Sequence, residues 1–261
     1  IIPVPDKRLD KLNDLIQPKK KINTNIEIYD IAGLVKGASK GEGLGNKFLS
    51  NIRETNAIIH VLRCFDNDNI THVEGNTDPV RDLEIINTEL IFKDMETIEK
   101  AIEKNNKLIK IGNKDAMIKK DNLSKIYDDL SSGNLIINLD LSHDEIELIS
   151  SYNLLTEKPI LYVCNVDENS VVNGNHYVDS VRKYLNQNDK IILIAASIES
   201  EIIDLSIEDQ LVFLKEMGLS ESGLNKLIST CYELLKLETF FTAGKKEVRS
   251  WTVRKSSKSS W

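Results

Sequence analysis

The sequence lacks several features that would assign a chain to a class at once. It holds three cysteines, too few and too widely spaced for a disulfide framework or a paired zinc site: Cys64, Cys164 and Cys231. We therefore expect buried free thiols, as in a reducing compartment. No apolar run approaches the roughly 18 residues of a membrane span, and the first residues form no signal peptide.

An excess of positive charge is also missing. The chain has 34 Lys and Arg against 41 Asp and Glu, which gives a formal net charge of −7. This balance argues against broad nucleic-acid binding driven by total charge. Local basic runs such as residues 19–21 are interpreted as solvated faces. The 261 residues, 41% hydrophobic and 29% charged, predict a globular protein with one large domain or two smaller ones.

No Gly-x-x-x-x-Gly-Lys-Ser/Thr motif occurs, although another part of a P-loop NTPase does. The apolar run Ile26–Tyr29 leads into Asp30 and Gly33, and a glycine-rich stretch follows as far as Gly45. In such a segment the Asp approaches Mg²⁺ through water, and the Gly amide turns to the γ-phosphate because no Cβ blocks it. The sequence therefore predicts an NTPase without its phosphate cradle.

Short apolar runs alternate with helical patterns along much of the chain. The runs have little polar alternation, as expected for strands buried on both faces: Ile26–Tyr29, Ala57–Phe65, Pro159–Cys164 and Lys190–Ala196. The helical patterns include Asn46–Thr55 and Tyr177–Gln187. This order predicts an α/β fold of the P-loop NTPase type, with a mostly parallel sheet and flanking helices.

The middle of the chain interrupts this alternation with two helical seams. The first contains Ile91, Met95, Ile98, Ile102 and Ile109, and the second Ala116, Leu123, Ile126 and Leu130. Gly112 separates them, and a capping box over residues 142–145 predicts another helix. We expect an inserted α-helical coiled-coil hairpin at residues 88–155, with ordinary crossover helices as the alternative.

The last third predicts two helices and one strand. The helices are Ser206–Met217 and Gly223–Leu237, and Glu247–Val253 alternates like a strand. No other segment nearby has a strand pattern, so this strand is expected to have no partner of its own.

A second candidate site follows the apolar run that ends at Cys164. Asn165, Val166 and Glu168 stand where guanine-specific relatives read Asn-Lys-x-Asp, whose Asp accepts two hydrogen bonds from guanine. A Glu moves the carboxylate by about 1.5 Å, which spoils a bidentate geometry. Guanine selectivity should therefore fall. An Asn that caps the next turn is the alternative.

Together these residues resemble the Obg-like ATPase, or YchF, family of translation-factor-related P-loop NTPases. The resemblance covers nearly the whole chain. It is carried by residues 30–45, by Asn51-Ile52-Arg53-Glu54-Thr55, Val61-Leu62-Arg63-Cys64-Phe65, Asn87-Thr88-Glu89-Leu90 and Phe241-Thr242-Ala243-Gly244.

The resemblance implies a nucleotide-binding domain at 1–87 and 156–237, the helical insertion at 88–155, and the start of a TGS domain at 238–261. It also implies ATP hydrolysis with Mg²⁺, ATP preferred over GTP, a cytoplasmic location and association with ribosomes. Neither a membrane nor sequence-specific DNA is expected as a partner.

Particular roles follow from the same resemblance. Leu34 stands where Ras-like enzymes carry a water-orienting Gln, so another group must orient the water. His72 resembles the family's loop histidine proposed for this task, and with Gly33 it forms the expected catalytic set. Ala196 and Ser197 match the last base-contacting loop. An exposed loop histidine and a plain strand-end turn are the respective alternatives.

Two departures from the family pattern leave alternatives open. The chain does not begin with Met and contains no P-loop, so we expect its start to be missing and these residues alone to bind nucleotide poorly. It also contains only an apparent first strand of the TGS domain. The alternatives are a guanine nucleotide hydrolase of the Obg or Era type, and a non-hydrolysing remnant that acts as a binding module.

Overall fold

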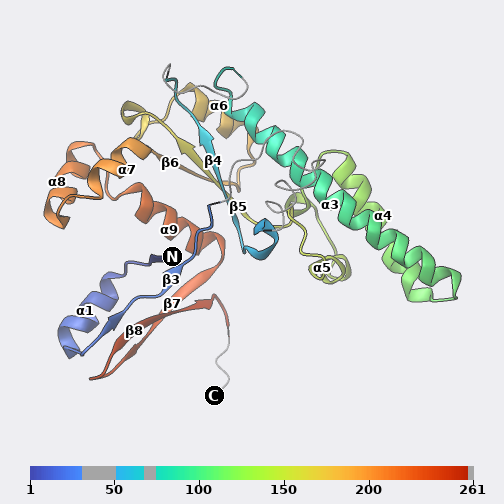
Figure 1. Ribbon diagram of the computed structural model, residues 1–261, viewed down its shortest axis with the longest axis horizontal. Coiled ribbons are helices and arrows are strands. Elements are labelled where there is room, and N and C mark those ends of the chain that lie inside the picture. The colour runs from blue at the N-terminus through green and yellow to red at the C-terminus, as the bar shows by residue number, and fades with distance from the viewer. Residues whose placement is uncertain (31–50, 68–74, 258–261) are drawn as a thin grey trace. The chain divides into compact units, whose positions relative to one another are not determined.

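In a computed structural model of the chain, the described residues are 1–30, 51–67 and 75–257 (Figure 1). They divide into two compact units. Among the described residues, the first unit contains 1–30, 59–67, 75–77 and 160–257, and the second contains 51–58 and 78–159. Among the described residues, no helix combines the length and the apolar character that a bilayer crossing requires.

A three-stranded sheet in the order β4-β5-β6 forms the centre of the first unit. Its strands are β4 (Ile58–Arg63), β5 (Ile160–Asn165) and β6 (Lys190–Ile194), close to three of the predicted runs. β5 and β6 are parallel, with Asn165 opposite Ile194. A buried cluster here contains Leu161, Val163, Ile192 and Cys231. The strand sequences lack polar alternation because both faces of the sheet are covered.

The strand predicted at Ile26–Tyr29 is wrong. β3 covers only Asn25–Ile26 and pairs antiparallel with β1 (Ile2–Pro3), outside the parallel sheet. Ile28 is 39% exposed and Tyr29 62% exposed. A short apolar run indicates that burial is favourable, but it does not identify the neighbouring strand.

The expectation of a partnerless strand near the C-terminus is also wrong. β8 (Val248–Arg254) pairs antiparallel with β7 (Leu237–Ala243) and parallel with β2 (Lys21–Ile22). Two of these strands were not predicted, because β2 is two residues long and β7 directly follows a helix. That helix stops where Lys236 adopts a φ of 53°, and a lysine gives no helix-stop signal.

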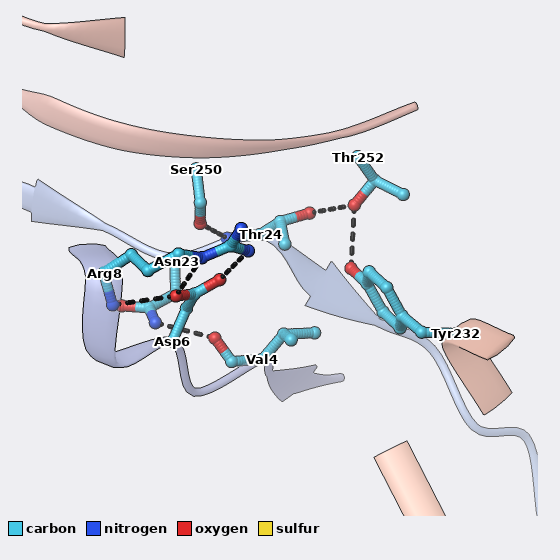
Figure 2. A network of polar contacts seen from close by, with 8 residues as sticks. All are labelled: Val4, Asp6, Arg8, Asn23, Thr24, Tyr232, Ser250 and Thr252. Carbon is cyan, nitrogen blue, oxygen red and sulfur yellow. Dashed lines mark hydrogen bonds and ion pairs between the residues drawn. The ribbon is translucent and has the colours of Figure 1, made fainter. Parts of the chain in front are cut away.

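Hydroxyl groups connect the two ends of the chain within the first unit (Figure 2). The Thr24 amide donates to Ser250 Oγ at 2.8 Å, and the Thr24 and Thr252 hydroxyls lie 2.7 Å apart. The Tyr232 hydroxyl is 2.8 Å from the same Thr252 oxygen. Because Ser250 is only 2% exposed, its bond to Thr24 satisfies a polar group that would otherwise be buried alone.

Apart from α7, the remaining described helices of the first unit begin at side-chain caps. Asn175 caps α6 with its side chain, Ser206 caps α8 and Ser222 caps α9. The helices are α1 (Lys7–Ile16), α6 (His176–Tyr184), α7 (Ala196–Ile202), α8 (Ile207–Glu216) and α9 (Gly223–Leu234), with a 3₁₀ turn η2 at Glu168–Ser170. α9 packs against β5, β6 and β7.

The second unit is a long helical hairpin. α3 (Pro79–Lys110) and α4 (Lys114–Ser131) pack along each other, joined by a turn in which Gly112 has a φ of 90° (Figure 1). The α4 seam is confirmed, since its four predicted residues are at most 1% exposed. The end of the α3 seam differs: Ala101 and Asn105 are buried there, in place of Ile102 and Ile109. The buried residues 91, 94, 98, 101 and 105 are spaced 3-4-3-4, so the second row of the seam lies one position earlier on the helix than predicted.

A buried carboxylate anchors the return from the hairpin. Asp94 on α3 accepts hydrogen bonds from the Leu155 amide at 2.8 Å and from the Thr156 amide and hydroxyl at 2.7 and 2.8 Å. Burial raises the pKa of this carboxyl group, while these hydrogen bonds and the nearby Arg53 oppose the shift. The turn η1 (Ile136–Asn138) and α5 (His143–Ser150) precede this return, and the predicted capping box of α5 is present.

Candidate nucleotide-base site

The ends of two neighbouring strands meet at one polar contact. Asn165 is the last residue of β5, and its Oδ1 accepts a hydrogen bond from the Ala196 amide at 3.1 Å. Ala196 begins α7, directly beyond the end of β6. The carboxyl ends of parallel strands are the usual place of a ligand site in such sheets. The structure thus brings Asn165 and Ala196, 31 residues apart, to one edge of the sheet.

Val166 and Glu168 have different surroundings in this loop. The Val166 side chain is 3% exposed, and its amide donates to the Ile194 carbonyl at 2.9 Å. That amide is therefore already bonded within the sheet. Glu168 is exposed at the start of η2, which Asp167 caps by accepting from the Ser170 amide at 3.1 Å. A ligand could therefore contact the Glu168 side chain, whereas the Val166 side chain is not accessible to it.

The first turn of α7 offers amide donors beside Asn165. Ala195 at its N-cap has no side-chain hydrogen bond to the helix, and Ser197 is exposed. First-turn amides of a helix have no partner within the helix, so they are available to a carbonyl or ring nitrogen. Ala195 supplies no side-chain cap, and the Ala196 amide is already bonded to Asn165, so a ligand would use the amides that follow Ala196.

The phosphate end of the predicted site is only partly described. Asp30 is exposed, whereas Gly33 and His72 lie outside the described residues. No group of three His, Cys, Asp or Glu side chains that could hold a metal occurs in the described part of the chain. A single carboxylate is nevertheless compatible with Mg²⁺, which keeps several waters and takes further ligands from substrate phosphates.

The described ends of the segment that contains His72 are anchored to the first unit. The Tyr177 hydroxyl lies 2.8 Å from both carboxylate oxygens of Asp66. Asn175 Nδ2 donates to the Cys64 carbonyl at 2.8 Å, while its Oδ1 caps α6. At the far end, the Thr77 hydroxyl donates to the Phe65 carbonyl at 3.4 Å. The anchoring roles of Tyr177 and Asn175 were not predicted, and the Asn before a helical pattern was the available signal.

The three cysteines, Cys64, Cys164 and Cys231, are buried free thiols, as expected. A hydrogen bond from Cys64 lowers the pKa of the Cys164 thiol against the effect of burial, and burial raises the pKa of Cys231 to about 11. The His60 ring on β4 lies 6.0 Å from the Tyr162 ring between centroids, which is a packing contact.

A separate groove of about 480 Å³ lies in the helical unit and was not predicted. Its lining combines charged and apolar side chains of α3, α4 and α5, among them Lys104, Asp115, Ile118, Lys119, Glu147 and Leu148. It contains none of the residues predicted to bind nucleotide.

The fold and the strand-end contact define a class, the α/β nucleotide-binding proteins with an inserted helical hairpin. The model of a family described as "50S ribosome-binding GTPase" matches residues 11–114. The chain is 50% identical to the ribosome-binding ATPase YchF of Bacillus subtilis over 99% of its length, and covers 71% of that relative. It is 47% identical to the YchF protein of Escherichia coli O157:H7 over 97% of its length, and covers 70% of it.

A solved structure agrees with these relatives. The structure of the Schizosaccharomyces pombe YchF GTPase superposes with a TM-score of 0.86 at 38% identity, over 98% of this chain and 70% of that one. The chain belongs to the YchF family. The predicted mixed α/β fold, with its parallel sheet and its long helix pair, is confirmed.

Proposed function

We propose that this chain contains the base-recognition part of an ATPase and that it selects adenine over guanine. The hydrogen bond from the Ala196 amide to Asn165 Oδ1 carries this proposal, because it joins the two loops that would face a purine. The relatives from Bacillus and Escherichia are named as ATPases, which supports the same reading.

The preference for ATP rests on what is lacking at the strand end. Glu168 is one methylene longer than the Asp of a guanine clamp, so its carboxylate is displaced by about 1.5 Å from a bidentate position. Val166 replaces a long cation with a buried aliphatic side chain. Adenine would then be recognised by backbone groups, with the exposed first turn of α7 at Ser197 as the nearest donor set.

At the phosphate end, Asp30 would hold Mg²⁺ through water, and the Gly33 amide would contact the γ-phosphate. Mg²⁺ neutralises phosphate charge when it is bound. His72 is proposed to orient the attacking water, because Leu34 cannot do so and an imidazole near neutral pH can. We propose ATP hydrolysis for the full-length gene product, and weak nucleotide binding by these 261 residues, which contain no P-loop motif.

Ribosome association is the second part of the proposal. The Bacillus relative is named a ribosome-binding ATPase, and the matching family model is described as ribosome-binding. We propose that the ribosome is a partner, in the cytoplasm, and that residues 88–155 act as a separate helical domain between 1–87 and 156–237. Residues 238–261 are proposed to begin a TGS domain.

A guanine nucleotide hydrolase is the second candidate, because the solved yeast relative is titled a GTPase. Competition of ATP and GTP against one fluorescent nucleotide separates the two readings, on the full-length gene product and on this chain. We expect ATP to bind at least as tightly as GTP. Tighter binding of GTP by tenfold, about 1.4 kcal/mol, would overturn the proposed specificity.

A further inference from the structure

An apolar patch lies exposed on α8 and on the connection that precedes it. Five large aliphatic side chains within ten residues are 37–78% exposed. They are Ile203, Leu205, Ile207, Leu211 and Val212. Single exposed aliphatic residues are ordinary, but a run of five in one short segment is typical of an interaction site. We call these five residues the α8 patch.

The local structure keeps the patch together. Ile207 and Leu211 are one turn apart, so they share a face of α8, and Val212 follows at the next position. Gln210 Nε2 donates to the Leu205 carbonyl at 3.1 Å, which folds the connection back onto the helix. The Leu205 amide in turn donates to the Ile202 carbonyl at 3.1 Å, at the end of α7.

The core does not require these side chains. Leu214 supplies the buried contact of α8 at 5% exposure, and Ile202 does so for α7 at 4%. Glu199 accepts hydrogen bonds from the Gly223 and Leu224 amides at 2.7 and 3.1 Å, which fixes α7 to the start of α9. The segment is therefore held in place while the patch faces outward.

Negative charge is concentrated in the segment that contains the patch. Between residues 201 and 221 all six carboxylates are exposed, and the one cation is Lys215. The carboxylates are Glu201, Asp204, Glu208, Asp209, Glu216 and Glu221. The segment thus carries an excess of five negative charges at neutral pH together with its exposed aliphatic side chains.

Exposed aliphatic side chains together with an excess of carboxylates favour one kind of binding partner. Nucleic acid and anionic lipid surfaces are repelled by the carboxylates. A second copy of the same face would place two sets of like charges against each other. A protein segment with Lys or Arg around large apolar side chains satisfies both features, because its cations meet the carboxylates while its apolar face covers Ile207 and Leu211.

We propose that the α8 patch is a docking surface for a cationic amphipathic segment of another protein. Its exposed aliphatic side chains supply affinity, and the carboxylates of the same segment supply the choice of partner and the rate of encounter. This surface is distinct from the base loop of Asn165 and does not depend on nucleotide binding.

The test uses the full chain and three synthetic 18-residue peptides: an amphipathic Leu/Lys helix, a Ser/Lys peptide of equal charge and a Leu/Glu helix. Fluorescence anisotropy at about 0.15 M salt, where the Debye length is about 8 Å, measures binding. We expect the Leu/Lys peptide to bind and the others to bind at least tenfold more weakly. Methyl NMR shifts should change at Ile203 and Ile207 and stay unchanged at Ile111 and Ile118.

Matched variants make the result specific. The pair Ile207→Ser and Leu211→Ser should weaken binding at least tenfold, whereas Ile111→Ser and Ile118→Ser, equally exposed on the helical unit, should change it less than twofold. Glu208→Gln with Glu216→Gln should weaken binding several-fold and reduce its dependence on salt. All four positions in the two pairs of Ser variants are exposed, so the fold should be unaffected, and circular dichroism checks this.

Three results would overturn the proposal. The first is an equal loss of binding in both Ser pairs, which would mean attraction by total charge alone. The second is self-association of the wild type in sedimentation that the Ile207→Ser and Leu211→Ser pair abolishes. The third is binding to anionic vesicles through the same residues.

Discussion

At the scale of single residues, Asn165 is the side chain on which the proposed base site depends. Its Oδ1 bonds to the Ala196 amide, so it orders a second loop as well as its own. Glu168 stands exposed beside it, while Val166 is buried. Substitution of Glu168 should therefore change nucleotide specificity with little effect on folding, whereas substitution of Val166 should have a larger effect on folding.

The first prediction concerns these two positions. Glu168→Asp should move nucleotide preference towards GTP, because the shorter side chain restores the position of a guanine-binding carboxylate. Adding Val166→Lys should increase the shift towards GTP and reduce stability. The Val166 position is only 3% exposed, so a charged ammonium group there would have to be buried or forced out to solvent. Titration with labelled ATP and GTP measures the preference. Asn169→Asp, which adds a carboxylate one residue away, is the control and should leave it unchanged.

The second prediction concerns His72. In the full-length gene product, His72→Ala should lower ATP hydrolysis by about 10²-fold or more, the usual scale for a lost general base, while ATP affinity stays near that of the wild type. Steady-state hydrolysis with and without ribosomes, together with nucleotide titration, measures both quantities. An unchanged rate would remove His72 from the mechanism.

At the scale of elements, caps and buried polar anchors decide where the helices end and how they return. α5 is the clearest case, because Glu145 bonds to the Ser142 amide at 2.8 Å and to Lys125 of α4 at 2.8 Å. These contacts lower the pKa of Glu145 to about 2, with the bond from Lys125 as the largest cause. One carboxylate therefore caps α5 and connects it to the hairpin.

The third prediction follows from that pKa. Because the folded pKa lies below the ordinary value of 4.5, the contribution of Glu145 is present at neutral pH and is lost as pH falls from about 4.5 towards 2. Glu145→Gln should cost about 1 kcal/mol at pH 7, the usual size of a cap. Urea unfolding at pH 7 and at pH 2–3 measures the difference, which should shrink at acid pH. Glu147→Gln on the same helix is exposed and should have little effect at either pH.

At the scale of the whole molecule, the chain forms two units with separate cores. Leu161, Val163 and Ile192 belong to the core of the first. Ile52, Leu90 and Leu155 form a cluster in the second. The described residues of the first unit come from three distant parts of the sequence, 1–30, 59–67 with 75–77, and 160–257, so its stability depends on contacts between distant segments.

The fourth prediction tests whether the two cores are energetically separate. Leu123→Ala on α4 and Leu161→Ala on β5 each remove a fully buried side chain and should cost about 2–5 kcal/mol. Hydrogen exchange read by mass spectrometry should accelerate in α3 and α4 for the first variant, and in β5, β6 and α9 for the second. Acceleration of both units to the same degree in either variant would show that they unfold as one.

Local patterns in the sequence were sufficient to predict the features that rest on neighbouring residues. The three longer apolar runs correspond to β4, β5 and β6. The α4 seam and the α5 capping box lie at the residues predicted for them. These features depend on helical or strand periodicity and on side chains three or four positions apart. The place of the candidate base residues directly after a strand is likewise a local pattern, and their role stays a prediction.

Only the tertiary structure decided which distant segments meet. Ile26–Tyr29 has the composition of a buried strand, yet only Asn25–Ile26 is paired, and with β1. The Glu247–Val253 run found partners in β2 and β7, one of them more than 200 residues away. Strand pairing depends on backbone groups that every residue shares, so composition cannot name the partner. For the same reason, the bond from the Ala196 amide to Asn165 was visible only in the folded chain.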